Sequence, residues 1–266
     1  MSGFLRGVVA IYRKEMGHYL VSPVAYVVLG MFLLIGGLFY YTILTFYMER
    51  SLAASMQAMQ FGAPPEVDVP SMTINSLFGV LGQVALFLLP MATMGVYAEE
   101  RRRGTIELLM TSPVTDWQIV LGKYLASFSL FLILLLPTLA YHGVLFWKSE
   151  PRPPLGIMLS GYLGLLLLGG AFLALGNFIS SLTESQLIAA VVTFCVALVL
   201  WIIDIAGPGA GTTIGELFQY LSVLRHYEDF ARGVVDTTSL VFFGSWIALG
   251  LFLTLRSLDS MRWRRA

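Results

Sequence analysis

Five consecutive charged residues, Glu99 to Arg103, stand in a sequence of 266 residues of which only 12% are charged. They follow an uncharged stretch, 77–98, and precede Gly104, Thr105 and the apolar residues 106–110. Carboxylate and guanidinium groups in such a run suit ion pairs and contacts with lipid head groups. An apolar stretch beside them suits contact with a protein. The segment therefore predicts binding rather than catalysis.

The residues after the charged run predict a short helix. Gly104 breaks the run and lets the chain turn. Thr105 fits the N-cap of a helix that covers Ile106–Met110, and Glu107 is well placed in its first turn. The helix is expected to present Ile106, Leu108, Leu109 and Met110.

The end of this short helix is also predicted. Ser112 precedes Pro113, which disfavours helical geometry at Ser112. Thr115 and Gln118 then fit a capping box, which begins the next helix before the membrane. The segment is thus one helical turn or so, lying between the ends of two longer helices.

Two interpretations of the segment remain open on physical grounds. In one, its apolar residues dock into a protein partner. In the other, its arginines anchor the chain at the membrane surface and the short helix rests on lipid head groups. The expected membrane-surface anchors are Arg13, Lys14, Arg101, Arg102, Arg103 and Lys123.

Common catalytic and nucleotide-binding motifs are missing from the sequence. Gly122-Lys123 is followed by Tyr124, and Trp117 stands where a P-loop needs its first glycine, so we expect no nucleotide in this chain. Neither H-E-x-x-H nor G-x-S-x-G is present. The single cysteine, Cys195, has no partner for a disulfide and no neighbours for a metal set. We expect no catalytic residue, cofactor or metal in this chain.

The composition is that of an integral membrane protein. Hydrophobic residues make up 57% of the chain and the mean hydropathy is +0.79. A soluble domain would carry about 25% charged residues, roughly twice the fraction found here. The formal net charge is zero and does not indicate a nucleic-acid partner.

Six segments are long and apolar enough to cross a bilayer, which takes about 20 residues. We expect an all-α, polytopic protein with one transmembrane domain over residues 1–266. The spans are expected at about 24–48, 77–98, 124–147, 155–179, 186–203 and 239–255. The third contains Pro137. In the fourth we interpret five glycines as sites of close helix packing: Gly161, Gly164, Gly169, Gly170 and Gly176.

The regions between the spans are assigned as follows. Residues 1–22 predict an amphipathic helix at the membrane surface, although Glu15 falls within its apolar arc. Residues 99–115 form the loop described above. Residues 207–238 are too short and too charged to span, and predict a surface or re-entrant helix on the outer side.

Lys and Arg are distributed unevenly across these regions. The N-terminus, the loop 99–123 and the C-terminus hold eleven of them, and the opposite side holds five. The positive-inside rule then places both termini and the loop in the cytoplasm. Six spans with both ends inside are self-consistent.

The segment "EERRRGTIELLMTSPVTDWQIVLGK" resembles the signature loop of ABC-2 type permeases, the membrane subunits of ATP-driven transporters. The residues that match the pattern E…GT-x-E-x-L…P…GK are Glu100, Gly104, Thr105, Glu107, Leu108, Pro113, Gly122 and Lys123. "YRKE…SPVAY" and "SSLTESQLIAA" resemble the family's connecting helix and its turn between spans four and five. "YEDFARGVVD" resembles the last outer loop of gliding-motility type and nitrous-oxide-reductase maturation permeases.

This resemblance, which covers nearly the whole chain, implies partners and a role for the loop. It implies a dimer with a second copy or a paralogue in the inner membrane of a bacterium, and a separate cytosolic subunit that binds ATP and Mg. It implies that the loop is the coupling helix that contacts this subunit. The residues expected to make or support that contact are Glu100, Gly104, Thr105, Ile106, Glu107, Leu108, Leu109, Met110 and Pro113.

Three functions follow as hypotheses. The first is the permease subunit of an ATP-driven exporter. The second is an anchoring subunit of a motility or secretion complex that moves no substrate. The third is a carrier that works without ATP, for which Gln83, Thr93 and Asn177 are the available mid-span polar residues. The sequence assigns no substrate and no substrate-binding residue.

Overall fold

The computed structural model describes residues 3–62, 68–150, 152–203, 205 and 212–263. Within these ranges all regular structure is helical, which confirms the all-α class. The helices, in chain order, are α1 (Gly3–Val21), α2 (Pro23–Phe61), α3 (Val69–Thr93), α4 (Ala98–Arg102), α5 (Ile106–Thr111), α6 (Asp116–Leu135), η1 (Leu136–Thr138), α7 (Leu139–Lys148), α8 (Leu155–Leu182), α9 (Gln186–Ile202), α10 (Thr212–Leu221), α11 (Val223–Ala231) and α12 (Thr237–Trp263).

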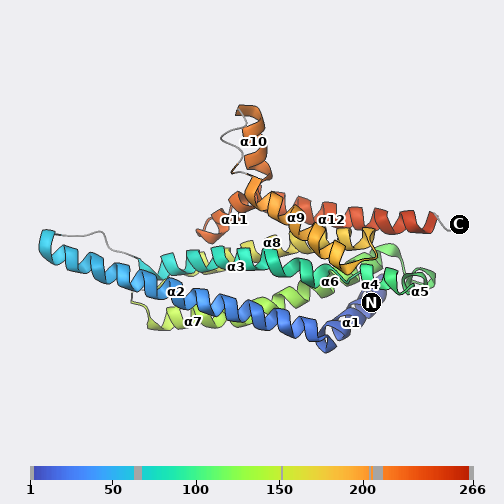
Figure 1. The fold of residues 1–266 in the computed structure, drawn as a ribbon, viewed down its shortest axis with the longest axis horizontal. Helices are drawn as coiled ribbons and strands as arrows, with labels where there is room; N and C mark the ends of the chain where they lie inside the picture. Colours follow the sequence, from blue (N-terminus) through green and yellow to red (C-terminus); the bar gives the residue numbers. More distant parts are fainter. Residues whose placement is uncertain (1–2, 63–67, 151, 204, 206–211, 264–266) are drawn as a thin grey trace.

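The long helices form an elongated membrane-type bundle (Figure 1). Among the described residues, five continuous or nearly continuous helical segments are long and apolar enough to cross a membrane, and α9 is a shorter apolar helix. The 17 residues of α9 rise about 26 Å, close to the roughly 30 Å of a hydrocarbon core. Helix α1 and the last turns of α12 lie at the same end of the bundle (Figure 1). The sixth span expected from the sequence, at about 186–203, falls on the shorter helix α9.

The first two spans differ in length from the sequence expectation. The first helix does not end near residue 48 but continues to Phe61, because residues 49–61 are mostly good helix formers without a glycine or proline. Gly62 ends it with a positive φ of 95°. The second helix covers Val69–Thr93 and is followed by a turn, instead of running over 77–98.

The third span is interrupted at its proline. The α-helix α6 ends at Leu135, and Pro137 lies in the short 3-10 turn η1 before α7 continues to Lys148. Proline has no backbone N–H and its ring clashes with the preceding turn, so the α-helical hydrogen-bond pattern cannot continue through it.

Helix α8 lies in the core of the bundle, and its glycines allow this. A Cβ atom at Gly161 would lie 2.2 Å from the Phe78 ring, one at Gly169 2.1 Å from the Phe131 ring, and one at Gly176 2.2 Å from Thr93 Oγ1. No side chain fits at these distances, so α3 and α6 approach the α8 backbone directly. The interpretation of these glycines as packing residues is confirmed.

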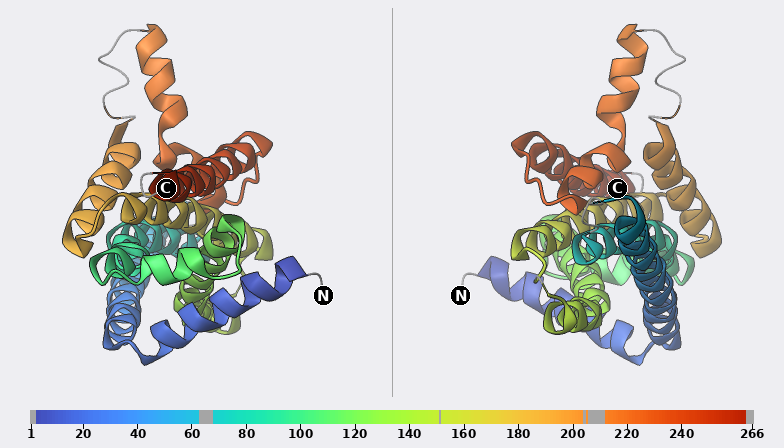
Figure 2. Two further views of the ribbon diagram at one scale, coloured as in Figure 1. Left: turned by 90° about the vertical axis from the view of Figure 1, so that its right-hand side faces the viewer. Right: turned by 90° about the vertical axis from the view of Figure 1, so that its left-hand side faces the viewer.

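The described part of the segment expected at 207–238 begins at Thr212 and contains two short helices, α10 and α11. Helix α10 projects away from the bundle (Figures 1 and 2). Helix α11 instead packs into it through Tyr227 and Phe230, which are buried. The Tyr227 hydroxyl donates a hydrogen bond to the Phe78 carbonyl oxygen at 2.6 Å.

Helix α1 lies across the bundle rather than along it, as an end-on view shows (Figure 2). It packs against α6 at Gly122, where an added Cβ atom would lie 2.8 Å from the Ile11 side chain. Val8, Ile11, Glu15 and Met16 form its buried face. Part of the apolar face predicted for the membrane surface thus packs on α6, and the orientation brings α1 next to the charged loop.

Candidate functional site

The short helix predicted in the charged loop is present as α5, Ile106–Thr111. Gly104 makes the turn before it with a φ of 69°. Thr105 occupies the N-cap position, although its hydroxyl donates to the Glu100 carbonyl oxygen at 3.3 Å and does not cap the helix. Ser112, with a ψ of 155°, ends the helix before Pro113 as predicted.

The apolar residues of α5 divide between an inner and an outer face. Ile106 is only 5% exposed and packs with Val96, Tyr97 and other residues of a buried cluster. It therefore supports the helix from inside the chain and does not belong to the presented surface, contrary to the sequence expectation. Leu109 packs partly against the same cluster, whereas Leu108 is 72% exposed. The side chain of Met110 lies outside the described residues.

The exposed surface of the segment is small and mixed in character. Leu108 is its apolar centre, and Glu107 and Pro113 are also exposed. Trp117, at the start of α6, is 44% exposed. The structure thus provides one prominent leucine on a helix that is fixed from below by Ile106.

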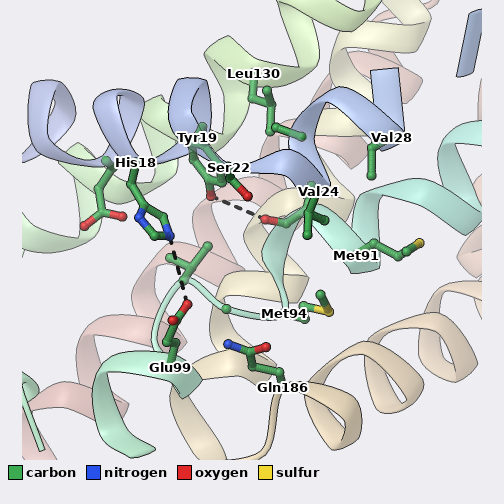
Figure 3. Close-up of a pocket in the computed structure, with 15 residues that line it drawn as sticks. His18, Tyr19, Ser22, Val24, Val28, Met91, Met94, Glu99, Leu130 and Gln186 are labelled. Atoms are coloured by element: carbon green, nitrogen blue, oxygen red, sulfur yellow. Dashed lines mark hydrogen bonds and ion pairs between the residues drawn. The ribbon is translucent and has the colours of Figure 1, made fainter. Parts of the chain in front are cut away.

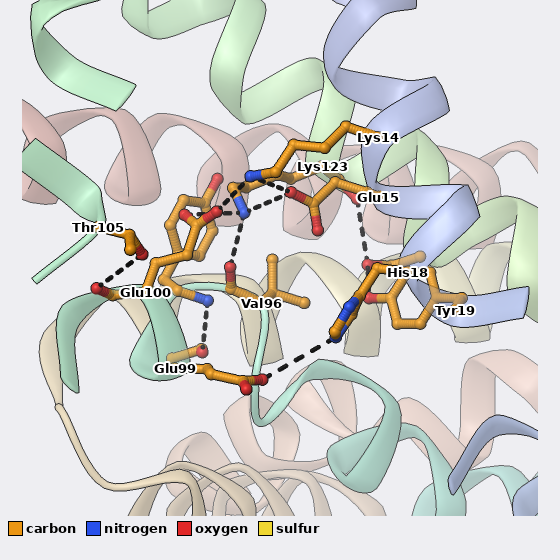
Figure 4. Close-up of polar contacts among 12 residues, drawn as sticks. Lys14, Glu15, His18, Tyr19, Val96, Glu99, Glu100, Thr105 and Lys123 are labelled. Carbon is orange, nitrogen blue, oxygen red and sulfur yellow. Dashed lines mark hydrogen bonds and ion pairs between the residues drawn. The ribbon is translucent and has the colours of Figure 1, made fainter. Parts of the chain in front are cut away.

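A network of charged residues lies beneath this loop (Figure 4). The Lys123 ammonium group donates to Glu15 Oε1 at 2.9 Å and to the Val96 carbonyl oxygen at 2.8 Å. It also forms an ion pair with Glu100 Oε2 at 3.0 Å and lies 5.1 Å from the centre of the Tyr97 ring. Four segments of the chain meet at this one ammonium group: α1, the turn after α3, α4 and α6.

Lys123 was expected to anchor the chain at the membrane surface, and this expectation is wrong. Its side chain is 1% exposed. Burial of an ammonium group is costly unless it is paired. Here two carboxylates and a carbonyl oxygen provide the pairing, so Lys123 stabilises contacts between helices and does not reach lipid head groups.

Lys14 lies at the open edge of the same network. Its ammonium group is 2.7 Å from Glu100 Oε1 and 3.3 Å from Glu15 Oε1, and its side chain is 57% exposed. Burial acts to lower the pKa of Lys14, but its hydrogen bond to Glu100 and the charges of Glu100 and Glu15 outweigh this and raise the pKa. Lys14 therefore carries its charge and partly neutralises the two carboxylates.

The arginines of the loop have different surroundings. Arg101 donates to the Ser181 carbonyl oxygen at 2.6 Å and lies 3.8 Å from Glu184, so it ties the loop to the turn between α8 and α9. Arg103 forms an ion pair with Glu99. Arg102 and Arg13 are exposed, as a membrane-surface anchor must be.

The turn between α3 and α4 is also held by α8. The Ser180 hydroxyl accepts hydrogen bonds from the backbone N–H groups of Tyr97 and Ala98, both at 3.2 Å, and donates to the Met94 carbonyl oxygen at 3.0 Å. Backbone groups in a buried turn need such partners. Residues 94–98 are therefore fixed from both sides.

A cavity of about 130 Å³ lies beside the network (Figure 3). Its polar lining includes Glu15, His18, Glu99 and Gln186, and its apolar lining comes from the beginning of α2 and the end of α3. His18 Nε2 is 4.0 Å from Glu99 Oε2. The cavity separates α1 from the beginning of α9.

Sequence reasoning had placed Glu100 and Lys123 in one motif without giving the reason for their spacing. The structure shows that they pair with each other. The sequence does not indicate that Glu15 and the Val96 carbonyl oxygen are also partners of Lys123. The available signal was the carboxylate of Glu15 in an otherwise apolar arc, since a buried carboxylate needs a cation.

The long apolar helices and their exposed apolar surfaces are those of a multi-pass membrane protein. Comparison with family models gives a match to the ABC-2 family transporter proteins over residues 57–214. This match covers more than half of the chain, and the chain belongs to this family.

Curated relatives agree with this assignment. The chain is 23% identical over 212 residues to a protein of Escherichia coli strain K12 described as the probable multidrug ABC transporter permease YbhR, and to its counterpart in strain O157:H7. The alignment covers 76% of this chain and 54% of each relative. The chain thus spans about half the length of these relatives.

Proposed function

We propose that this chain is the permease subunit of an ATP-driven exporter in the inner membrane of a bacterium, with the loop 99–115 in the cytoplasm. A separate subunit binds ATP and Mg and contacts the chain at α5. The observation that carries the proposal is the exposure of Leu108 at the tip of a short helix whose other face is fixed by Ile106. On a helix supported in this way, an exposed leucine is positioned to enter a pocket of the partner, as anchor residues at protein interfaces do.

The contact has a thermodynamic requirement. ATP hydrolysis in another subunit can drive this chain only if α5 binds differently to the two states of that subunit. Binding must also move the membrane helices. Because α5 is packed against the bundle through Ile106, a displacement of α5 also displaces the helices that it contacts. Arg102 and Arg13 are exposed beside it and suit contact with anionic head groups.

Transport is the activity that the relatives' description names. Because the chain spans only about half of those relatives, we extend to it the transport class and leave the substrate unassigned. We further propose that two permease chains form the membrane unit. Helix α2, whose apolar residues are mostly exposed, and the apolar helix α9 offer surfaces for lipid and for such a second chain.

The proposal is tested by capture of the ATP-binding subunit. A tagged chain, purified in mild detergent from its native host, is expected to retain a protein that carries a P-loop and hydrolyses ATP. Leu108→Asp and Glu107→Arg are each expected to lose this protein or to leave its ATP hydrolysis uncoupled from the chain, while the level of inserted chain stays unchanged.

A control uses another exposed apolar residue, at the other end of the bundle. Val235 is 53% exposed in the loop before α12, so Val235→Asp introduces the same charge away from α5. This variant is expected to retain the ATP-hydrolysing protein. Normal capture and normal coupling in both α5 variants would contradict the proposal.

A further inference from the structure

We propose that Lys123 is a positioning residue that fastens the loop carrying α5 to both α1 and α6, so that a displacement of α5 is passed to these two helices together. The inference rests on the proposed function, since the ATP-binding subunit would supply the displacement. It adds the route by which the movement leaves the loop.

The contacts of Lys123 join the three parts. A lysine ammonium group has three N–H donors, and Lys123 Nζ has three oxygen neighbours, at 2.9 Å on α1, 2.8 Å on the turn after α3, and 3.0 Å on α4. The lysine itself belongs to α6. Glu15 Oε1 and the Val96 carbonyl oxygen accept hydrogen bonds from this ammonium group, and Glu100 Oε2 forms an ion pair with it.

The route from α5 to this lysine is short and direct. Thr105, at the N-cap of α5, donates its backbone N–H to the Glu100 carbonyl oxygen at 3.0 Å, and its hydroxyl donates to the same oxygen at 3.3 Å. The Glu100 carboxylate then contacts Lys123. A movement of α5 therefore reaches α6 through two contacts, Thr105 with Glu100 and Glu100 with Lys123. It reaches α1 through the ion pair of Lys123 with Glu15 (Figure 4).

A purely stabilising role would not require these charges. Replacing a buried ion pair by apolar residues of similar volume is often neutral or stabilising, whereas what a buried pair adds is a defined geometry. The network contains two cations, Lys14 and Lys123, and two carboxylates, Glu15 and Glu100, so its charge is balanced. Lys14 is half-exposed and screened by solvent, which leaves Lys123 as the member that connects the helices.

The test measures whether α1 and α5 move as one body. Spin labels are placed at Arg13 on α1 and Thr111 on α5, both exposed, after the exposed Cys195 has been replaced by Ser. In the native background, the distance distribution between the labels is expected to have a single narrow maximum. ATP with vanadate, added to the complex with the ATP-hydrolysing subunit, is expected to leave that maximum in place, because both helices move together.

The decisive variant is Lys123→Met combined with Glu15→Gln and Glu100→Gln, which removes the ion pairs without leaving an unpaired buried charge. It is expected to lose the single maximum, and ATP with vanadate is then expected to change the distance. Lys14→Met, which removes only the exposed cation, is the control and is expected to behave as the native chain. If the triple variant does not fold, Glu15→Gln alone, which removes the link to α1, is expected to broaden the distribution.

A narrow, ATP-insensitive distribution in the triple variant, or in Glu15→Gln where the triple variant does not fold, would overturn the inference. The measurement without nucleotide needs no partner subunit, so its result is independent of the proposed function. Capture of the ATP-hydrolysing protein by Glu15→Gln is expected to persist, because this change lies on α1 and leaves Leu108 and the rest of the loop unchanged. Loss of capture on Leu108→Asp therefore tests the proposed function separately.

Discussion

The two ends of this bundle each hold a short helix that does not cross the membrane, but they hold it by different interactions. Helix α5 is attached through Ile106 and a network of four charged side chains, of which Lys14 is exposed and the other three are largely buried. Helix α11 is attached through two buried aromatic rings, Tyr227 and Phe230. A Cβ atom at Gly82 would lie 2.7 Å from the Tyr227 ring, and one at Gly164 would lie 2.4 Å from Phe230 Cβ.

The difference shows how each helix responds to force. Aromatic rings seated on glycines gain from dispersion and burial, and they lose contact gradually when they shift. Ion pairs between buried groups depend steeply on geometry, because a charge that loses its partner remains without water. Helix α5 is thus joined to its neighbours by contacts that resist separation, which suits transmission of movement, while α11 is packed as part of the core.

The largest expected effect on the free energy of unfolding is at the end of the bundle that holds α5 and Lys123. Lys123→Met leaves Glu15 and Glu100 buried with only Lys14 as a cation, and removing one partner of a buried pair costs about 3–5 kcal/mol. Unfolding by denaturing detergent in mixed micelles measures the loss. Adding Glu15→Gln and Glu100→Gln is expected to recover most of it. A loss no larger than that of Lys14→Met would show that the network is not a buried unit.

At the aromatic end, Gly164→Ala is expected to have the next largest effect. The added methyl group overlaps Phe230, and overpacking of this kind costs about 1–3 kcal/mol. Gly156→Ala is the matched control on the same helix, since nothing lies within 4 Å of a Cβ atom there. The control is expected to be neutral or stabilising, and equal effects in the two variants would contradict the close packing of α11 on α8.

Tyr227→Phe tests the polar part of the same contact. It keeps the ring in place and removes the hydrogen bond to the Phe78 carbonyl oxygen, which is worth about 0.5–1.5 kcal/mol. The same unfolding measurement applies. Tyr26→Phe, which removes an exposed hydrogen bond to the Leu20 carbonyl oxygen, should cost less than Tyr227→Phe.

The smallest expected effect is that of Lys14→Met. An exposed ion pair contributes about 0–1 kcal/mol and is screened by salt. Because its pKa is raised in the folded chain, the contribution of Lys14 is fully present below the unfolded lysine pKa and is lost as the pH rises through the folded value. Unfolding at low and high salt near neutral pH measures it. If Lys14→Met lowered the free energy of unfolding as much as Lys123→Met does, and independently of salt, Lys14 would not differ from Lys123 as an exposed residue at the edge of the network.

Local signals in the sequence predicted where α5 begins and ends, although the Thr105 hydroxyl does not cap it. Gly104, Ser112 and Pro113 act on their immediate neighbours, so the turn and the end of α5 were predictable. Which residues of α5 face the bundle could also have been predicted. Ile106 and Leu109 are three residues apart and share a helix face, whereas Leu108 lies on the other side.

The network itself was not predictable, because its partners are distant in the sequence. Lys123 and Glu15 are 108 residues apart, and Lys123 meets the Val96 carbonyl oxygen across 27 residues. Their meeting depends on how α1 crosses α6, which Gly122 permits. The positive-inside rule treats every lysine near a span end as a surface group, and it therefore misassigned Lys123, which is buried by tertiary packing.

The most direct test of the central claim is site-specific photo-cross-linking at Leu108. A photoreactive amino acid replaces Leu108 in one chain and Val235 in another, and both are irradiated in native membranes. A cross-link from position 108, but not from 235, to a P-loop protein that hydrolyses ATP is the result that the account predicts. Cross-links from position 108 to lipid alone, with the chain inserted normally, would contradict it.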